Sequence, residues 1–207
     1  MRLALMASGT GSNVEVLLSE KQAGNLPSVD WVLLGCDRPN APVIQKAEFH
    51  SLKTWVHSPS EFANKTQYEK SLHLVLSEHE VDGVVLAGYM RLIGPTLLEH
   101  WEGRIINLHP SLLPSFPGQH SIRDALQYRV KLTGCTVHFV DEGVDTGPII
   151  AQESVPVFSA DTTETLAKRI HRAEHSLLPK TVRRWSEGGF YLKDKIVHFV
   201  DEVGETI

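Results

Sequence analysis

Three polar residues stand in apolar surroundings where a purely structural segment would have little use for them. Asn107 and His109 end the apolar run IINLH, and Asp145 lies in the glycine-flanked loop GVDTGP. Positions i and i+2 of a β-strand point to the same side, so Asn107 and His109 would face the same volume. An imidazole that titrates near neutrality and an amide N–H that never ionises could together polarise a carbonyl and stabilise the oxyanion formed when it is attacked.

Asp145 would complete such a site by orienting His109 and raising its pKa, or by relaying a proton through water. A structural alternative stays open, in which Asn107 and His109 are satisfied polar groups of the core and Asp145 forms an Asx turn. No serine or cysteine stands in a motif that would support a nucleophile, so the three residues favour direct group transfer over a covalent intermediate.

The glycine-rich segment SGTGSN at residues 8–13 is a second candidate site. It follows an apolar run and opens a helical pattern, so the backbone N–H groups of this segment could hold an anion, most plausibly a phosphate, at the helix N-terminus. Val14 occupies the place of the third glycine of GxGxxG, and no Gly-Lys-Ser/Thr follows, so neither a dinucleotide fingerprint nor a Walker A loop is indicated. A tight turn capped by Ser12 or Asn13 explains the segment equally well.

The segment AGYMRLIGP at residues 87–95 sets Met90, Leu92 and Ile93 beside Arg91. A strand end followed by a proline-marked helix start accounts for it structurally. At the edge of a sheet, the same residues would form an apolar lip that receives a flat aromatic ligand.

The eleven histidines raise the question of a metal site. His171 and His175 are four residues apart, but HRAEH does not have the order of the zinc motif HExxH. We therefore predict no metal.

The composition limits the classes of function. With 42% hydrophobic and 22% charged residues, the 207-residue chain is ordinary globular material, and its net charge of -5 gives no general attraction to nucleic acid or anionic membrane. The N-terminal apolar run is too short to span a bilayer. Cys36 and Cys135 lie in apolar stretches, which indicates buried thiols rather than a disulfide framework. We expect a cytoplasmic enzyme.

Apolar runs alternate with helical patterns over the first 110 residues, which is typical of a parallel sheet with helices on both faces. The expected strands are 2–8, 29–35, 52–57, 81–88 and 104–109, and the expected helices are 13–22, 41–50, 60–80 and 95–101. Functional loops of such a sheet lie at the carboxyl ends of its strands.

The pattern changes after residue 110. Residues 132–140 and 148–157 are expected to form two strands of an antiparallel addition. A long amphipathic helix follows from 161, with Asp161 or Thr162 as N-cap and Glu164 reaching back in a capping box. VHFVDE occurs at 137–142 and again at 197–202, which we interpret as two strands with similar packing needs. The fold class is therefore α/β, a Rossmann-like, mostly parallel sheet with helices on both faces and an antiparallel C-terminal addition.

SGTGSN, LAGYMR, NLHPSLLPSFPG, TGCTVHFVDEGVDTGPII and RIHRAEH together resemble the folate-dependent formyltransferases, over about residues 1–190. NxHPSLLP followed by a downstream DxGPII is specific to that superfamily, whereas the glycine loop alone is a weak signal. The resemblance implies one formyltransferase domain over residues 1–207. Its expected parts are a nucleotide phosphate-binding half (about 1–100), a catalytic and folate-binding half (about 101–190) and a C-terminal strand extension (about 189–207).

The resemblance also implies a reaction, the transfer of the formyl group of 10-formyltetrahydrofolate to the amine of glycinamide ribonucleotide in purine biosynthesis. Asn107 and His109 would stabilise the tetrahedral oxyanion. Asp145 would hold His109 protonated and help to move the amine proton to the leaving folate nitrogen. The implied partners are these two small molecules, with no metal, nucleic acid or membrane, and the protein would be a monomer or a homodimer.

Binding residues follow from the same resemblance. The ribose phosphate would lie on Gly11, Ser12 and Asn13, with Glu174 on the ribose hydroxyls. The folate would be held by two segments, whose residues are Met90, Arg91, Leu92, Ile93, Val140, Asp141 and Val144. His171 stands where some relatives carry a glutamine and Ser115 where some carry a basic residue, and we assign a role to neither.

Three alternatives remain. A formyltetrahydrofolate deformylase passes the formyl group to water, but it normally carries an N-terminal regulatory domain that we expect this chain to lack, and SGTGSN favours a phosphorylated acceptor. Methionyl-tRNA formyltransferase would show a further C-terminal domain and an RGAAP-like segment in place of PGQHS. A non-catalytic folate- or nucleotide-binding module would not need Asn107, His109 and Asp145 together.

Overall fold

The structure is a computed structural model that describes residues 1–200. Contacts within the chain divide it into two units, Met1–Ile106 and Asn107–Ile207, which we call unit 1 and unit 2. Residues 201–207, which include the end of the second VHFVDE and of the expected C-terminal strand extension, lie outside the described residues.

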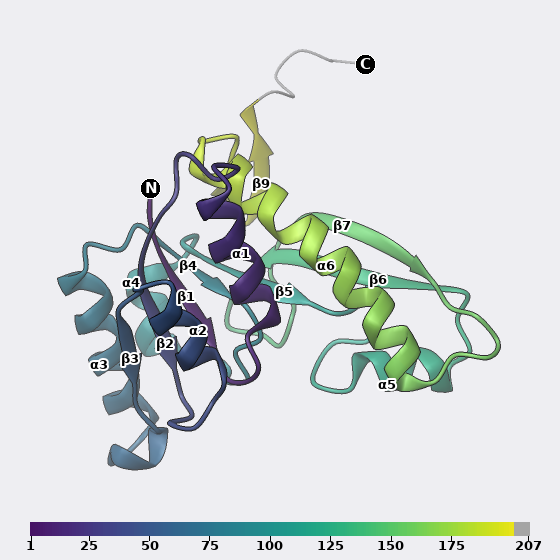
Figure 1. Cartoon of the computed structure of the whole chain (residues 1–207), viewed down its shortest axis with the longest axis horizontal. Coiled ribbons are helices and arrows are strands. Elements are labelled where there is room, and N and C mark those ends of the chain that lie inside the picture. Colours follow the sequence, from purple (N-terminus) through teal and green to yellow (C-terminus); the bar gives the residue numbers. More distant parts are fainter. Residues whose placement is uncertain (201–207) are drawn as a thin grey trace. The chain divides into compact units, whose positions relative to one another are not determined.

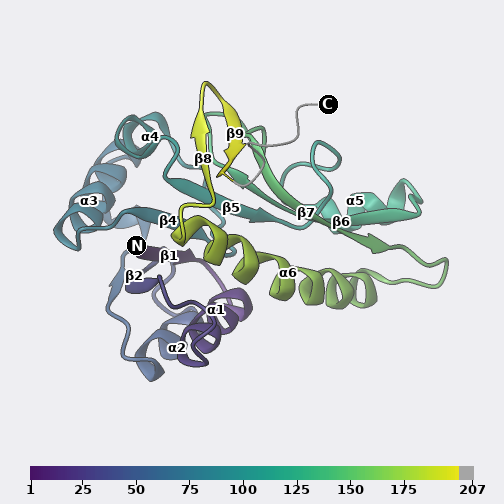
Figure 2. The same cartoon turned by 90° about the horizontal axis from the view of Figure 1, so that it is seen from above.

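Unit 1 alternates strands with helices, as the alternation of apolar runs and helical patterns in the sequence predicts. In chain order its elements are β1 (Arg2–Ala7), α1 (Ser12–Gln22), β2 (Asp30–Cys36), α2 (Val43–Phe49), β3 (Thr54–Val56), the 3-10 helix η1 (Pro59–Glu61), α3 (Lys65–Glu78), β4 (Gly83–Leu86), α4 (Pro95–Trp101) and the start of β5 (Ile105–His109). β1 pairs in parallel with β2 and β4, and β2 with β3. Figure 2 shows α1 and α2 on one face of these strands and α3 and α4 on the other.

The core of unit 1 is centred on β1, in which five of the six residues are buried. β1 has a strand on each side and helices over both faces, so a continuous apolar run suits it better than an alternating one. Leu3 and Leu5 are both 0% exposed. Burying each such leucine contributes about 2 kcal/mol.

The helix expected over 60–80 is divided into two elements. Ser58 caps η1 with a capping box completed by Glu61, and Asn64 caps α3 by accepting a hydrogen bond from the Gln67 N–H at 2.9 Å. Two N-cap side chains within seven residues start two helices, because each satisfies backbone donors that a continuous helix would have paired itself.

Unit 2 is built around an antiparallel pair of strands and one long helix. After the end of β5 its elements are α5 (Ser121–Gln127), β6 (Leu132–Phe139), β7 (Ile149–Pro156), α6 (Thr163–Ser186), β8 (Phe190–Lys193) and β9 (Ile196–Phe199). β6 pairs with β7 and β8 with β9, both in antiparallel fashion. Figure 1 shows α6 lying along β6 and β7, which it contacts. The short helix α5 is absent from the sequence-based expectation.

α6 has the amphipathic pattern that the sequence predicts. Leu166, Ile170 and Leu178 are at most 1% exposed. Thr162 is the N-cap, but the residue that reaches back to it is Thr165, whose hydroxyl accepts from the Thr162 N–H at 2.9 Å. The prediction of Glu164 in that role was wrong, because only the third helical residue after the N-cap lies over its N–H.

The larger sheet has the strand order β3-β2-β1-β4-β5-β6-β7, and β8 and β9 form a second sheet of two strands. The mostly parallel α/β fold class with its antiparallel C-terminal addition is thereby confirmed. Among residues 1–200 there is no helix with the length and apolar character needed to cross a bilayer.

Candidate active site

Asn107, His109 and Asp145 lie together in unit 2. The first two are at the end of β5, and Asp145 lies in the loop between β6 and β7. The Nδ1 atom of His109 is 3.3 Å from Oδ2 of Asp145, and Nδ2 of Asn107 donates to Oδ1 of Asp145 at 3.4 Å. The His109 side chain is 5% exposed and that of Asp145 14%. The two strand residues therefore reach the same carboxylate, as their i, i+2 spacing predicts.

His138 on β6 belongs to this cluster, and sequence reasoning missed it. Its Nε2 atom is 3.1 Å from Nδ2 of Asn107 and 3.7 Å from Oδ1 of Asp145, while its Nδ1 donates to the backbone carbonyl of Phe139 at 2.8 Å. His138 thus lies against both the Asn107 amide and the Asp145 carboxylate. The signal was present, because Thr136 and His138 are polar residues at i and i+2 of an apolar strand, as Asn107 and His109 are.

The charge of Asp145 is set by opposing effects. Burial raises its pKa, but His138, the backbone N–H of Gly118 and the neighbouring His109 outweigh burial, so the pKa of Asp145 lies below its usual value. The Gly118 N–H donates to Oδ2 at 2.7 Å. Asp145 itself has φ 55°, in the left-handed region that few non-glycine residues adopt. The loop thus holds a carboxylate that is ionised at neutral pH beside an imidazole.

His109 has a hydrogen-bond acceptor at each ring nitrogen. Nε2 lies 2.9 Å from the backbone carbonyl of Phe116, and Nδ1 faces Asp145. A proton on either ring nitrogen therefore has an acceptor nearby. Phe116 has φ 55°, an uncommon conformation for a large side chain. A substrate oxygen that binds Nε2 would therefore replace the Phe116 carbonyl.

Thr136 fixes the loop that follows β5. It is 0% exposed, its hydroxyl donates to the Ser111 carbonyl at 2.7 Å, and it accepts from the Leu113 N–H at 3.1 Å. Gln152 on β7 donates to the Leu113 carbonyl at 2.9 Å. These contacts, together with the prolines, define the path of the loop that carries the Phe116 carbonyl to His109.

A pocket of about 210 Å³ adjoins the cluster in unit 2. Its lining residues come from the loops after β5 and β6 and from the start of β7, and they are Leu113, Pro114, Pro117, Val144, Asp145, Thr146, Gly147 and Ile149. Two of the predicted folate residues, Val140 and Asp141, begin the second of these loops. Asp141 shapes it, since Oδ1 accepts from the Gly143 N–H at 3.0 Å and from the Thr146 hydroxyl at 2.7 Å. The pocket is mostly apolar and has one carboxylate in its wall.

The predicted folate residues of unit 1 line a pocket of about 390 Å³. Met90, Arg91, Leu92 and Ile93 all take part, together with residues of α3 and α4. Met90 is 53% exposed and Leu92 61%. The apolar lip expected from AGYMRLIGP is therefore present and faces a cavity.

The glycine-rich loop leads directly into α1. Gly11 is the N-cap, with φ 70°, and no side chain caps the helix. The alternative of a cap by Ser12 or Asn13 is not observed, because Gly11 is the N-cap and both residues lie inside the helix. The start of an α-helix is the positive end of its dipole, so this end of α1 is suited to an anion.

Glu174 lies on the buried face of α6 in unit 2, between Ile170 and Leu178. Its side chain is 4% exposed, and one oxygen is 2.8 Å from Nδ1 of His171. That hydrogen bond raises the pKa of His171 above its usual value. A carboxylate at an apolar position of an amphipathic helix is costly to bury, which supports a functional role for it.

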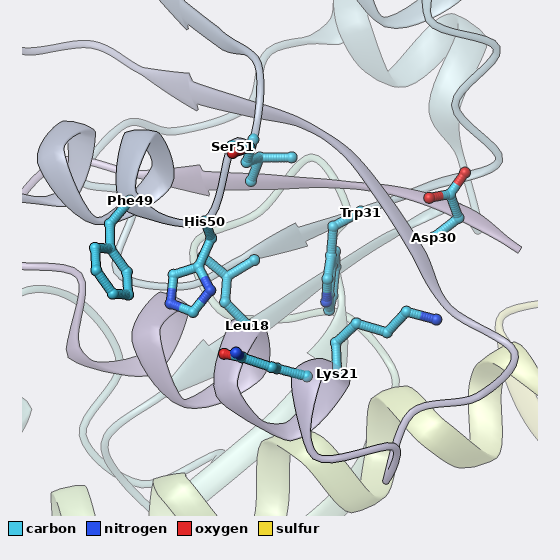
Figure 3. Close-up of a pocket in the computed structure, with 9 residues that line it drawn as sticks. Leu18, Lys21, Asp30, Trp31, Phe49, His50 and Ser51 are labelled. Atoms are coloured by element: carbon cyan, nitrogen blue, oxygen red, sulfur yellow. The ribbon is translucent and has the colours of Figure 1, made fainter.

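Figure 3 shows a further pocket of unit 1, of about 450 Å³, with Leu18, Lys21, Asp30, Trp31, Phe49, His50 and Ser51 on its wall. Its charged groups already have protein partners. Lys21 donates to two backbone carbonyls, Asp30 pairs with Arg2, and His50 is 3.4 Å from Glu15. None of the predicted site residues lines it, so we assign it no chemistry.

Both cysteines are free and buried, as predicted. Burial raises the pKa of Cys36, and it raises the pKa of Cys135 to about 12. Within the described part of the chain, no three His, Cys, Asp or Glu side chains are grouped so that they could hold a metal ion.

This chain is similar to known proteins in sequence and in fold. The family model described as formyl transferase matches residues 1–182. Phosphoribosylglycinamide formyltransferase of Bacillus subtilis (strain 168) is 44% identical over 88% of this chain and 93% of that protein. Trifunctional purine biosynthetic protein adenosine-3 of Chironomus tentans is 38% identical over 94% of this chain, which spans only 14% of that longer protein. The crystal structure of glycinamide ribonucleotide transformylase 1 from Symbiobacterium toebii superimposes with a TM-score of 0.93, at 38% identity, over 97% of this chain and 94% of that one.

Proposed function

This chain belongs to the formyl transferase family, and from this premise we propose the reaction that its site serves. The enzyme transfers a formyl group to glycinamide ribonucleotide, a step of purine biosynthesis. The formyl donor is a folate, which we propose to be 10-formyltetrahydrofolate. The observation that supports direct transfer most strongly is the cluster of Asn107, His109 and Asp145, which joins an amide, an imidazole and a carboxylate.

In the proposed mechanism, the amine of the nucleotide attacks the formyl carbon and the carbonyl electrons move to oxygen. Asn107 donates to that oxyanion through Nδ2. Of the two contacts that Nδ2 makes, the one to Asp145 is the longer, at 3.4 Å against 3.1 Å, and the oxyanion would replace it more easily. His109 contributes positive charge next to the same oxygen.

Asp145 handles the proton. Attack leaves a positive charge on the amine nitrogen, and the bond to the folate nitrogen breaks only when that nitrogen takes up a proton. The carboxylate of Asp145 is ionised at neutral pH and can accept the amine proton and pass it on. No covalent enzyme intermediate is needed, and both cysteines are buried with raised pKa values.

We propose binding roles for the remaining predicted residues. In unit 1, the start of α1 at Gly11, Ser12 and Asn13 holds the phosphate, and the pocket of about 390 Å³ lined by residues Met90 to Ile93 takes part of the folate. In unit 2, the loop of Val140, Asp141 and Val144 takes part of the folate, and Glu174 serves the ribose hydroxyls. These roles, the expected single domain over residues 1–207, the monomeric or homodimeric state and the cytoplasmic location remain predictions.

One experiment tests the reaction. Purified protein is mixed with 10-formyltetrahydrofolate, with and without glycinamide ribonucleotide, and the loss of the formyl donor is followed together with the appearance of formylated nucleotide. We expect consumption only when the amine is present. Consumption at the same rate without the amine would identify a deformylase, and binding without consumption a non-catalytic module.

A further inference from the structure

Asp37 of unit 1 is a buried carboxylate to which the proposed reaction assigns no role. It follows β2 directly, and its side chain is 0% exposed. Oδ2 accepts from Nε of Arg91 at 2.7 Å, whereas Oδ1 is buried and has no hydrogen-bond partner among the described residues. A buried ion pair adds little stability compared with apolar residues of the same size, and a half-satisfied one adds less. Stability alone therefore gives no reason for a charge at this position.

Arg91, the partner of Asp37, is only partly enclosed. Its side chain is 50% exposed and lines the pocket of about 390 Å³ formed by Met90, Leu92 and Ile93. Within residues 1–200, Asp37 is the only group that its guanidinium hydrogen-bonds, through Nε, so both terminal nitrogens remain available. A planar guanidinium fixed at one nitrogen presents the others in a defined direction.

Among residues 1–200, Asp37 is the only carboxylate that forms an ion pair with this arginine. Tyr68 and Tyr89 line the same pocket and share a hydrogen bond of 2.8 Å between their hydroxyls. Burial raises the pKa of Tyr68 to about 12 and that of Tyr89 further, so both hydroxyls are neutral. The backbone next to Arg91 is fixed by a separate contact, because the Ser8 hydroxyl accepts from the Met90 N–H at 2.8 Å.

We propose that Asp37 is a positioning residue for the folate donor, acting through Arg91. The carboxylate fixes the guanidinium so that its terminal nitrogens meet acceptor groups of the donor in this pocket. The residues that follow two strands thus fix different parts of this segment. Ser8, after β1, holds the backbone of Met90, and Asp37, after β2, holds the side chain of Arg91. This inference rests on the proposed function, because it assigns a role within the same folate site.

The test is the Asp37→Asn variant, which keeps the shape of the side chain and removes its charge. We expect the KM for 10-formyltetrahydrofolate to rise roughly tenfold, as for the weakening of one charge-assisted hydrogen bond. The KM for glycinamide ribonucleotide should stay within twofold, and so should kcat at saturating donor. A defect in folding alone would lower the active fraction without separating the two KM values.

Asp161→Asn is the matched control. Asp161 also forms a buried pair with an arginine, since its side chain is 4% exposed and Arg169 lies 2.8 Å away, but neither residue lines the pocket of Arg91. This variant should leave the KM for the donor unchanged even if it lowers the unfolding temperature. An equal rise in donor KM for both variants would show that loss of any buried pair has this effect, and the proposal would be wrong.

Arg91→Lys supplies a second, independent test, because lysine keeps a cation near Asp37 but lacks the terminal guanidinium nitrogens. It should raise the donor KM as Asp37→Asn does, and the double variant should be no worse than either single one. Full additivity would mean that Asp37 does not act through Arg91. An unchanged donor KM in folded Asp37→Asn would overturn the proposal directly.

Calorimetric titration with tetrahydrofolate separates this inference from the proposed reaction. If the parent protein transfers no formyl group to glycinamide ribonucleotide, the proposed reaction fails, and the affinities of the parent and of Asp37→Asn for tetrahydrofolate still decide the role of Asp37. If the parent is active and the two affinities agree within twofold, only the role of Asp37 fails.

Discussion

Asp145 is the residue on which the proposed chemistry depends most. The side chains of Asn107 and His138 lie within hydrogen-bond distance of each other, and both lie next to Oδ1 of Asp145. Removing the negative charge would leave His109 and the Asn107 amide without their common partner. The cluster is therefore expected to act as a unit, in which single substitutions are not additive.

Asp145→Asn should lower formyl transfer to glycinamide ribonucleotide by at least about a hundredfold, because the amide cannot take up the amine proton. The measurement is kcat with both substrates saturating. Asp124→Asn, on α5 of the same unit, is the control and should keep its activity. Activity of Asp145→Asn within a few-fold of the parent would mean that this carboxylate does not handle the proton.

His171 gives a prediction about stability and pH. Its hydrogen bond to Glu174 raises its pKa in the folded state. The resulting stabilisation is complete below the unfolded pKa of about 6.5 and is lost as the pH rises through the folded pKa. His171→Gln should therefore cost stability at pH 6 and little at pH 9.

The expected loss at pH 6 is a few tenths to about 1 kcal/mol, because the His171 side chain is 48% exposed and the pair is screened. Urea unfolding at both pH values measures it, with the exposed His120→Gln as control. A loss that is the same at pH 6 and pH 9 would contradict the assignment.

At the scale of elements, the turn between β1 and α1 has a tight steric requirement next to the proposed phosphate site. Gly11 has φ 70°, and a Cβ added there would collide with the Val43 side chain at the start of α2. The Val43 N–H also donates to the Gly9 carbonyl at 3.2 Å. The loop is thus packed against α2, and glycine at position 11 lets the two approach.

Gly11→Ala should destabilise the protein by roughly 2–4 kcal/mol, from the left-handed backbone and the collision combined. Gly9→Ala, in the same loop, is the matched control, since a Cβ there meets nothing within 4 Å. Urea unfolding compares the two. If they cost the same, the shape of this turn does not depend on Gly11.

At the scale of the whole molecule, each unit contains one buried thiol. Cys36 is in unit 1 and Cys135 in unit 2, and both are 0% exposed. A thiol with a raised pKa and no access to solvent does not react as a thiolate. Each cysteine can therefore report when its own unit opens.

Neither thiol should react with a disulfide reagent at pH 8 while the protein is folded, and both should react in urea. Cys36→Ala and Cys135→Ala leave one reporter each, so the labelling rate against urea concentration gives the opening of unit 1 and unit 2 separately. Rapid labelling of the native protein at either position would contradict the burial described.

Much of this protein could be predicted from its sequence, because the signals are local. Apolar runs with period 2 or 3.6 mark strands and helices wherever they pack, so β1, β2, α4 and the apolar face of α6 lie close to their expected ranges. Asn107 and His109 share a face for the same reason. The divided helix before Tyr68 and the short α5 were missed, because two closely spaced caps and a seven-residue helix leave little periodicity to detect.

Only the tertiary structure decided which distant residues meet. His138 lies 31 positions from Asn107 and Asp37 lies 54 from Arg91. No period in the chain encodes such contacts, because they depend on the order in which strands pair and on the length of the loops between them. The sequence by itself determined the elements and the chemical groups available, and packing decided which of those groups became partners.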